Sequence, residues 1–452
     1  MSQNTNPARG MRDFLPAQVR RREYVISIIK EVYESYGFEP LETPAVENLE
    51  TLTGKYGEEG NQLIYKILKR GEKLNPNASE KDLSDLALRY DLTVPLARVV
   101  AQHKNDLPKF FKRYQIQPVW RADRPARGRY REFYQCDVDA IGSSSMIVEA
   151  ELCAAVSEIL VRLGFDDFVI RINHREILYA MLDAVEIVEE KQIDALVALD
   201  KLDKIGGEGV LKEFESREIN EGAANKLLGL FDKLKNSDNS HILESLSEFI
   251  GNYETGTQAT SQISQILKLA GLKSLKIDAS LARGLSYYTG AIFEVNVPDL
   301  SGSIASGGRY DGLIGMFGKE QIPACGFSLG LERILVVMEE RGMFPKELET
   351  NSADVLMTIW NEESIGESLK LAGELRQGNL RVLVYPEADK LGKQFKYASQ
   401  INVLFVCVLG ENELAENKVT LKNMQTGDQE TINRDEVAVS VKNYQKSSQR
   451  KI

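Results

Sequence analysis

The sequence predicts an α+β protein in which an antiparallel sheet is interrupted by a helical insertion and followed by a smaller α/β domain. Residues 109–120 and 130–141 are rich in aromatic and β-branched residues and flank a polar turn, which is the pattern of a long antiparallel hairpin. Residues 171–272 are mostly helix-forming and rich in Lys, Glu and Leu. Residues 355–409 alternate strand-like and helix-like segments, which is typical of a small α/β domain with a mixed or mostly parallel sheet.

The chain is expected to begin with a helix over residues 17–36, because its apolar residues recur with the spacing of one helix face. Gly37 ends that pattern. The next stretch, 38–46, is expected to be extended, and its prolines, Pro40 and Pro44, restrict it to a sheet edge or an interface. A proline-bearing edge next to an apolar helix predicts an edge that is covered or lies in a dimer interface.

The same two periodicities predict the remaining elements. Helices are expected over 146–163, 330–341, 365–377 and 390–400, and strands over 277–282, 292–297, 325–329, 355–359, 381–385 and 403–409. The changes of texture along the chain divide it into the segments 1–170, 171–272, 273–345 and 352–452, of which the second is an insertion.

The composition is that of a soluble globular protein. The chain has 452 residues, 43% hydrophobic and 27% charged, and it has no apolar run long enough for a membrane span. Because the first residues include no apolar run, no secretory signal is expected there. Its four cysteines are scattered, so zinc and disulfides are not expected and a reducing compartment fits. Because the net charge is −11, RNA binding would require a local basic cluster.

Such a cluster lies in the turn of the predicted hairpin, where five arginines fall within residues 121–131. Guanidinium groups bind phosphate bidentately and keep their charge when buried. Phe133 adds a flat face on which a base could stack. The turn therefore fits a nucleotide phosphate at its root and an RNA end at its tip. The alternative is a solvated basic hairpin, because charge runs usually face water.

A second signal is the arginine at position 283, which stands beside a glycine between apolar residues. An inward-facing arginine is costly unless it is paired with an anion. Tyr287 and Tyr288 follow it, and adjacent residues of a strand point to opposite faces, so only one of them need line a pocket. The alternative is a structural turn with core aromatics.

Residues 326–333 combine a strand, a glycine and a helix start, which places Arg333 on the first helical turn. There its charge adds to the helix dipole, which favours anions. The stretch 306–312, taken alone, could be only a loop. Neither stretch has the spacing of a dinucleotide-binding fold or of a P-loop. The alternative for the first is a tight strand–helix turn.

Asp91 and Thr93 are two residues apart in a stretch that is expected to be extended, so they face the same way. A carboxylate and a hydroxyl together could hold an ammonium group, although a helix cap is the commoner use of Thr93. The three histidines are isolated, and no arrangement for nucleophilic catalysis is visible.

Together these stretches resemble the signature motifs of class II aminoacyl-tRNA synthetases. The helix 17–36 with Pro44 resembles motif 1, residues 121–139 resemble motif 2, and residues 326–333 resemble motif 3. Three further stretches, 283–289, 307–313 and 89–93, resemble those of histidyl-tRNA synthetases, the last being closer to the eukaryotic-type branch of that family. The resemblance runs from about residue 8 to about residue 444.

The resemblance implies an α+β class II catalytic domain with an antiparallel sheet, formed by the segments 1–170 and 273–345. It further implies that 171–272 is an inserted helical domain that embraces tRNA, in which 195–204 is the best-matching part, and that 352–452 binds the anticodon. The implied protein is cytoplasmic and homodimeric, with no membrane or DNA partner.

The implied reaction joins L-histidine to ATP with release of pyrophosphate, and then transfers histidine to the 3′ end of tRNA(His), with Mg²⁺ on the phosphates. Arg121 and Arg283 would hold the α-phosphate and Arg333 the γ-phosphate, while Asp139 and Tyr288 would bracket the imidazole. The implied catalytic residues are Arg121, Arg283 and Arg333; the histidine-binding residues are Asp91, Thr93, Arg121, Gln135, Asp139, Arg283, Tyr287 and Tyr288; the ATP-binding residues are Arg121, Asp123, Phe133 and Arg333; no protein side chain is implied as a metal ligand.

The sequence departs from the family pattern at Asp123, where Glu is usual, and at Ser286, where Asp is usual. Both changes keep a polar group, so altered geometry is expected rather than lost function. Three alternatives are a non-catalytic regulator with the same fold, a class II synthetase for another small amino acid, and a purely RNA-binding module. The first typically lacks active-site arginines that are present here.

Overall fold

The computed structural model describes residues 4–53, 61–71, 79, 83–283, 287–318, 320–349 and 353–449. The chain forms two compact units, Met1–Phe344 and Pro345–Ile452. Within the described residues, no helix combines the length and the apolar character that crossing a bilayer requires.

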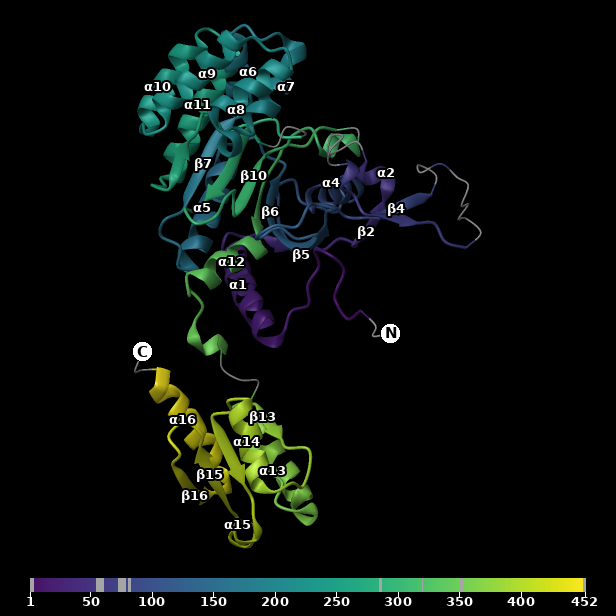
Figure 1. Cartoon of the computed structure of the whole chain (residues 1–452), viewed down its shortest axis with the longest axis vertical. Helices are drawn as coiled ribbons and strands as arrows, with labels where there is room; N and C mark the ends of the chain where they lie inside the picture. Colours follow the sequence, from purple (N-terminus) through teal and green to yellow (C-terminus); the bar gives the residue numbers. More distant parts are fainter. Residues whose placement is uncertain are drawn as a thin grey trace. The chain divides into compact units, whose positions relative to one another are not determined.

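The first unit is built on an eight-stranded sheet with the order β1-β5-β6-β11-β10-β9-β7-β8. Neighbouring strands run antiparallel except in the pairs β1–β5 and β7–β8, so the predicted antiparallel sheet is confirmed (Figure 1). The strands are β1 Glu39–Pro40, β5 Phe111–Trp120, β6 Glu132–Ile141, β7 Val169–His174, β8 Leu275–Ile277, β9 Ala291–Asn296, β10 Ala305–Arg309 and β11 Ala324–Gly330.

The predicted hairpin is confirmed as β5 and β6, which pair without interruption from Phe111–Ile141 to Trp120–Glu132. Aromatic and β-branched residues favour these strands because they pack well on a pleated surface. The turn between the two strands contains a bridge between Ala126 and Arg129, and Gly128 supplies the positive φ of 67° that such a tight turn requires.

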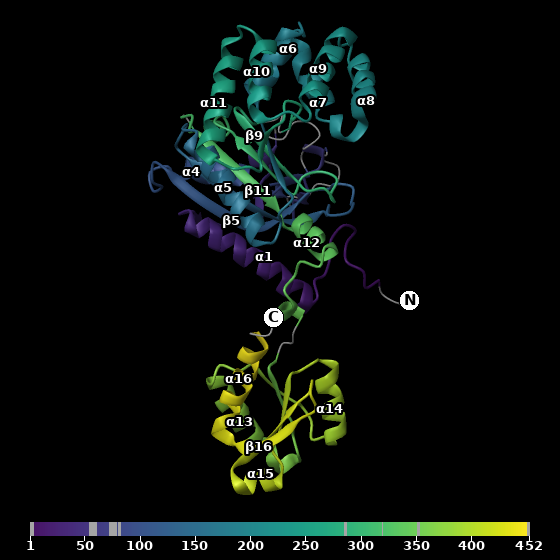
Figure 2. The ribbon, with the colours of Figure 1, turned by 90° about the vertical axis from the view of Figure 1, so that its left-hand side faces the viewer.

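Three helices cover one face of this sheet: α1 Pro16–Ser35, α5 Ile147–Arg162 and α12 Leu331–Glu340. Helix α1 contacts both α5 and α12, and α12 packs on β6 (Figure 2). The predicted apolar stripe of α1 is buried at Val25, Ile29, Val32 and Tyr33. The proline-bearing strand β1 lies at the sheet edge, as predicted.

A second, three-stranded sheet with the order β2-β4-β3 lies in the N-terminal part of this unit, and the periodicity did not reveal it. Its strands are short, and only β4 has five residues, so alternation is too brief to recognise. The elements here are β2 Val46–Asn48, α2 Leu49–Leu52, β3 Lys66–Leu68, β4 Ser84–Leu88 and α4 Thr93–Gln102.

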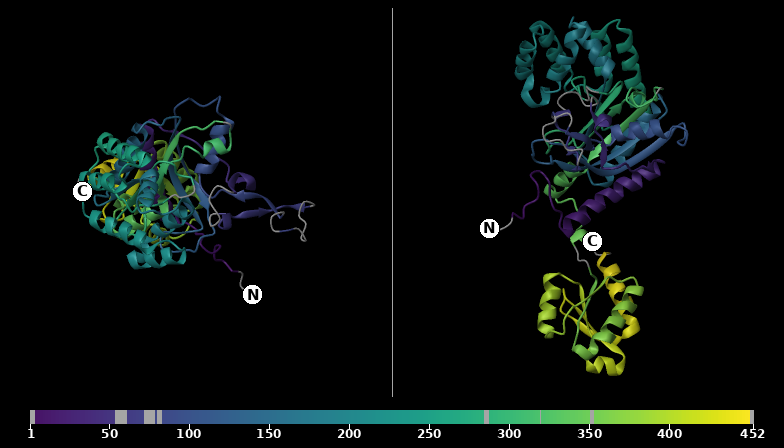
Figure 3. Two further views of the ribbon diagram at one scale, coloured as in Figure 1. Left: turned by 90° about the horizontal axis from the view of Figure 1, so that it is seen from above. Right: turned by 90° about the vertical axis from the view of Figure 1, so that its right-hand side faces the viewer.

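The helical insertion is present, and its helices gather at one end of the first unit (Figure 3). Strands β7 and β8 flank it and pair in parallel at the sheet edge, which anchors both ends of the insertion. Strand β7 was not predicted, because its polar residues Asn173 and His174 are buried rather than alternating with water-facing ones. The helices are α6 Arg175–Ala184, α7 Glu189–Leu199, α8 Leu202–Ser216, α9 Glu221–Leu234, α10 Asn239–Ile250 and α11 Glu254–Ala270.

One prediction in the returning sheet needs correction. The strand expected over 277–282 ends at Ile277, because the backbone N–H of Ser280 turns back to the Asp278 carboxylate. The stretch 306–312, which taken alone could be only a loop, contributes to the central strand β10. Its glycines hide the strand pattern, and Gly307 is required because a Cβ atom there would lie 2.2 Å from a backbone oxygen of β11.

The second unit is the predicted small α/β fold. Its sheet has the order β13-β12-β14-β15-β16. The pairs β13–β12 and β12–β14 are parallel, and the pairs β14–β15 and β15–β16 are antiparallel. The hairpin β15–β16 adds to the predicted elements. The elements are β12 Val355–Met357, α13 Ile365–Gln377, β13 Val382–Val384, α14 Leu391–Gln400, β14 Phe405–Val408, α15 Glu411–Glu416, β15 Lys418–Asn423, β16 Gln429–Asn433 and α16 Val437–Gln449.

Candidate active site

Two adjoining cavities lie in the first unit, and together they are lined by every side chain for which the sequence predicts a role. The arginine cavity, of about 210 Å³, is lined by Arg121, Arg129, Arg283 and Arg333 together with Asp123 and Phe133. The carboxylate cavity, of about 290 Å³, is lined by Asp91, Asp137 and Asp139 together with Thr93, Tyr287, Tyr288 and Tyr310. The two share Arg121, Gln135, Arg283, Ser306 and Ser328, so they meet at this set of residues.

Strand β6 spans both cavities. Alternate residues of a strand face the same side, and Phe133, Gln135, Asp137 and Asp139 therefore point into the site one after another. Gln135 donates to Ser328 Oγ at 3.1 Å, which ties the middle of this row to β11. One strand thus sets the distance between the aromatic end and the carboxylate end of the site.

Arg121 comes directly after β5 at the junction of the cavities. Its backbone N–H donates to the Arg131 carbonyl, and its Nε donates to the Tyr90 carbonyl at 3.0 Å. Its guanidinium lies 4.3 Å from the Tyr90 ring centroid and 5.2 Å from that of Phe133. Stacking and the hydrogen bond to the Tyr90 carbonyl orient this guanidinium, which lines both cavities.

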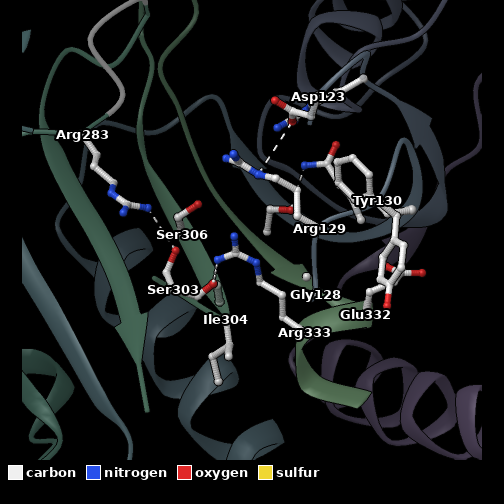
Figure 4. A pocket seen from close by; sticks show the side chains of 16 residues that line it. Asp123, Gly128, Arg129, Tyr130, Arg283, Ser303, Ile304, Ser306, Glu332 and Arg333 are labelled. Atoms are coloured by element: carbon white, nitrogen blue, oxygen red, sulfur yellow. Dashed lines mark hydrogen bonds and ion pairs between the residues drawn. The ribbon is translucent and has the colours of Figure 1, made fainter. Parts of the chain in front are cut away.

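Arg333 and Arg283 meet at one residue, Ser303 (Figure 4). Arg333 lies on the first turn of α12, as predicted, and donates to the Ser303 carbonyl. Arg283 donates through Nη1 to Ser303 Oγ at 3.2 Å. Burial lowers the pKa of Arg333, and the positive charges of Arg129 and Arg283 lower it further. Like charges held this close favour an anion between them.

Asp123 lies at the rim of the arginine cavity, where its Oδ2 atom is 3.9 Å from Arg129 Nε. The other carboxylate of this cavity, Glu332, accepts from Arg22 at 2.9 Å and from the Tyr134 backbone N–H at 3.0 Å. Among the described residues, no group of three His, Cys, Asp or Glu side chains is arranged to hold a metal ion.

Asp139 is buried at the far end of the carboxylate cavity, with two protein partners. Arg113 lies 2.8 Å from its Oδ2 atom, and the Tyr310 hydroxyl donates to its Oδ1 atom. Burial raises the pKa of Asp139, while the Arg113 charge and the Tyr310 hydrogen bond oppose that rise. Gly326 makes room for this carboxylate, because a Cβ atom there would lie 2.0 Å from Oδ1.

Asp137 is equally buried, and its Oδ1 atom has no hydrogen-bond partner among the described residues. Burial raises the pKa of Asp137 to about 7; the Arg113 charge lowers this pKa, and the Asp139 charge raises it. The Nε and Nη1 atoms of Arg113 are also without hydrogen bonds within the part of the chain that the structure describes. Buried polar atoms without partners are costly, and Asp137 lines the carboxylate cavity, so this side chain favours a polar ligand there.

Asp91 and Thr93 both line the carboxylate cavity, although not from one extended stretch, because Thr93 is the first residue of α4. The helix start is bonded by Asp91 rather than by Thr93: Asp91 Oδ1 accepts from the Val94 backbone N–H at 3.0 Å. The alternative in which Thr93 caps the helix is therefore wrong.

Tyr287 and Tyr288 also depart from expectation. They precede β9 instead of lying in a strand, and both line the carboxylate cavity, so the prediction that they point to opposite faces is wrong. Their ring centroids are 4.8 Å apart in an edge arrangement. Burial raises the pKa of both phenols, which keeps them neutral hydrogen-bonding groups. The departure at Ser286 lies outside the described residues.

Sequence reasoning assigned no role to Arg113, Asp137 or Tyr310. Arg113 and Asp137 are charged residues inside strands that were predicted from their apolar and aromatic residues. Charged residues in such strands could have indicated a functional role, because they are rarely buried unless they are paired. Tyr310 lies in the stretch 307–313, which was noticed only for its resemblance to a family. The sequence did not indicate that all three surround Asp139.

Comparison with known proteins gives one family over nearly the whole chain. The family model for histidyl-tRNA synthetase matches residues 10–334, and the model for an anticodon binding domain matches residues 354–444.

Individual relatives agree with these models. The chain is 42% identical over 450 residues to the histidine–tRNA ligase of Cytophaga hutchinsonii, covering 95% of this chain and 97% of that protein. It is 43% identical over 447 residues to that of Porphyromonas gingivalis, covering 95% of this chain and 97% of that protein. Among solved structures, the histidyl-tRNA synthetase from Nostoc sp. PCC 7120 superposes with a TM-score of 0.81 at 33% identity, covering 98% of this chain and 100% of that chain.

Proposed function

The chain belongs to the histidyl-tRNA synthetase family, and from this premise we propose how its residues divide the ligation of histidine to tRNA between the two cavities. ATP occupies the arginine cavity and histidine the carboxylate cavity. The observation that carries this proposal is that Arg121 and Arg283 line both cavities, at the point where the reacting atoms of two substrates would meet.

In the first step, a carboxylate oxygen of histidine forms a bond to the α-phosphorus of ATP. The bond from that phosphorus to the β-phosphate oxygen breaks, and pyrophosphate leaves. Such a transfer needs positioning and charge stabilisation more than acid–base groups. Arg121 and Arg283 stabilise the charge on the α-phosphate oxygens, and they also hold the histidine carboxylate.

The remaining residues of the arginine cavity hold the rest of ATP. Arg333 binds the γ-phosphate, helped by the N-terminal end of α12. Phe133 stacks on the adenine, and Asp123 contacts the nucleotide from the cavity rim. Mg²⁺ accompanies the phosphates and neutralises part of their charge; with Glu332 already paired, the phosphates themselves would be its main ligands.

Selectivity for histidine arises in the carboxylate cavity. Asp139 and Tyr288 bind the two ring nitrogens, and Arg113 with Tyr310 holds the Asp139 carboxylate in place. A side chain without two opposed nitrogens leaves buried polar groups unpaired, which costs several kcal/mol in all at ~1–3 kcal/mol each. The amino group of histidine is bound by Asp91, Thr93 and Gln135, and Tyr287 completes the wall.

In the second step, the terminal ribose hydroxyl of tRNA attacks the carbonyl carbon of the mixed anhydride, and AMP leaves. The basic turn at 121–131 and the insertion, 171–272, contact the acceptor end of tRNA(His). Residues 352–452 bind the anticodon, which the family match over 354–444 supports. The segments 1–170 and 273–345 form the catalytic domain.

The enzyme acts in the cytoplasm as a homodimer. Support for the dimer comes from strand β1 at the sheet edge and from the exposed apolar residues Leu15 and Val19 at the start of helix α1. No membrane or DNA partner belongs to the proposal.

Histidine-dependent exchange of pyrophosphate into ATP tests the proposed function. The full chain should catalyse exchange with histidine and not with other amino acids of a panel, and should then charge total tRNA with histidine only. Exchange driven by another amino acid would indicate a different synthetase. The absence of any exchange would favour a non-catalytic regulator or an RNA-binding module.

A further inference from the structure

An ion-pair network connects Arg283 to the helical insertion. The segment 195–204 is the part of the insertion in which the family resemblance is best. It supplies two members of this network: Asp200 at the end of α7, and Asp203 at the start of α8. Asp203 faces Arg171 on β7, and Asp200 faces Arg283, which precedes β9, so neither arginine lies on a helix of the insertion.

The centre of the network is Glu294, a fully buried carboxylate on β9. Arg283 Nε lies 2.6 Å from its Oε2 atom, and Arg171 Nη1 lies 3.7 Å from its Oε1 atom. Asn296 donates to Oε1 at 3.1 Å. A buried carboxylate is retained at low cost only when charge surrounds it, so Glu294 is held between two guanidinium groups.

The insertion closes this network at both ends. Asp200 Oδ1 lies 3.7 Å from Arg283 Nε, and Asp203 Oδ2 lies 2.7 Å from Arg171 Nη1. Carboxylates and guanidinium groups therefore alternate from Asp200 through Arg283, Glu294 and Arg171 to Asp203. Asp278 adds a further bond to Arg171 at 2.5 Å.

The orientation of Arg283 is set by these contacts. The 2.6 Å approach to Glu294 Oε2 is an ion pair without hydrogen-bond alignment, because that oxygen receives no aligned N–H. An ion pair without such alignment fixes the angle of the guanidinium only loosely, and a second carboxylate near the same Nε restricts that angle. With Nη1 bonded to Ser303, the Nε edge faces the network while the guanidinium lines both cavities.

We propose that Asp200, and through Arg171 also Asp203, act with Glu294 as positioning residues for Arg283, so that the rate of adenylate formation depends on the docking of the insertion against the sheet. The inference rests on the proposed role of Arg283 at the α-phosphate. A misplaced guanidinium stabilises the transition state less while leaving ground-state binding nearly intact.

The test uses the full chain and histidine-dependent pyrophosphate exchange without tRNA. Asp200→Asn should lower kcat about fivefold, the size expected of a partly exposed ion pair that acts on a catalytic group. KM for ATP and for histidine should change by less than about twofold. Asp200→Glu, which keeps the charge, should restore most of the rate.

Asp194→Asn is the matched control. Asp194 lies on the same helix, α7, and pairs with Arg217 inside the insertion at 2.7 Å. Both Asn variants should lower the unfolding temperature by similar amounts, whereas only Asp200→Asn should lower kcat. If Asp200 had a purely structural role, both variants would be less stable and neither would have a lower kcat.

Combining the substitutions separates this inference from the proposed function. On an Arg283→Ala background, Asp200→Asn should cause no further loss, because its effect passes through Arg283. Wild-type kcat in Asp200→Asn, or a full additional loss on the Arg283→Ala background, would overturn the inference alone. Wild-type exchange by Arg283→Ala itself would overturn the proposed function, and this inference with it.

Discussion

The two cavities treat buried charge in opposite ways. In the arginine cavity, Arg121 and Arg333 are fixed by backbone carbonyls, and Arg129 and Arg283 both repel the guanidinium group of Arg333. In the carboxylate cavity, the charge of Asp139 is already compensated by Arg113 and Tyr310. The arginine cavity therefore favours binding of an anion, while the carboxylate cavity holds hydrogen-bonding groups in fixed positions.

This difference assigns a different task to each cavity. Clustered positive charge is used best where negative charge develops on a phosphate during the reaction. A compensated and rigid frame is used best for recognition, because it rejects a ligand that leaves any of its members unpaired. Substitutions in the arginine cavity should therefore affect rate, and those in the carboxylate cavity should affect histidine affinity.

The largest effect is expected in the arginine cavity. Arg333→Ala should lower histidine-dependent exchange by about 10²–10³-fold, because it removes a preorganised charge from the triphosphate site. Histidine affinity, measured by calorimetry without ATP, should stay near wild type. Arg341→Ala is the control, since Arg341 follows the same helix and pairs with Asp167 and Asp299 away from both cavities. Equal losses in both variants would contradict a specific role for Arg333.

The next effect is expected in the carboxylate cavity. Asp139→Asn should raise KM for histidine by roughly 10- to 100-fold, the value of a hydrogen bond to a charged group. It should also destabilise the protein by about 3–5 kcal/mol, because Arg113 loses its buried partner. Urea unfolding measures that loss. Tyr310→Phe keeps the ion pair between Arg113 and Asp139, so its effects should be smaller in both assays. A normal KM for histidine in Asp139→Asn would contradict the role of the carboxylate cavity in binding histidine.

A smaller effect concerns pH. Since burial raises the pKa of Asp137 to about 7, this side chain is largely neutral at pH 6 and charged at pH 8. A charged carboxylate attracts the ammonium group of histidine, so KM for histidine should fall about three- to tenfold between about pH 6 and about pH 8. Asp137→Asn should lose the part of this pH dependence that comes from the Asp137 carboxylate. Identical pH profiles for both proteins would mean that Asp137 does not titrate in this range.

The smallest effect is the response to salt. KM for ATP should rise about threefold between about 0.05 and about 0.3 M salt, because the arginines of this cavity are only partly buried and ions screen their attraction for the phosphates. KM for histidine should change by less than about 1.5-fold over the same range, since its frame is buried. Steady-state exchange at several salt concentrations measures both; equal slopes would show that the cavities do not differ in this way.

The strand and helix patterns predicted the parts of this site that obey simple periodicity. The hairpin that carries Phe133 to Asp139, and the helix start that carries Arg333, follow from alternation and from a glycine before an apolar helix. Strand β10 did not, because Gly307 and Gly308 remove the side chains that periodicity reads.

Partnerships across the sheet could not be predicted either. Arg113 meets Asp139 only because β5 and β6 pair in a register that places these residues opposite each other. Glu294 on β9 pairs with Arg283, which comes before that strand in the chain. Such contacts depend on tertiary arrangement, and no local rule of sequence contains it.

A crystal structure of the full chain with a non-hydrolysable histidyl-adenylate analogue tests the central claim most directly. The account predicts that the phosphate mimic lies within hydrogen-bond distance of both Arg121 and Arg283, with the imidazole against Asp139. An analogue bound with its imidazole among the arginines, or with its phosphate mimic away from both shared guanidinium groups, would contradict the division of the site into two cavities.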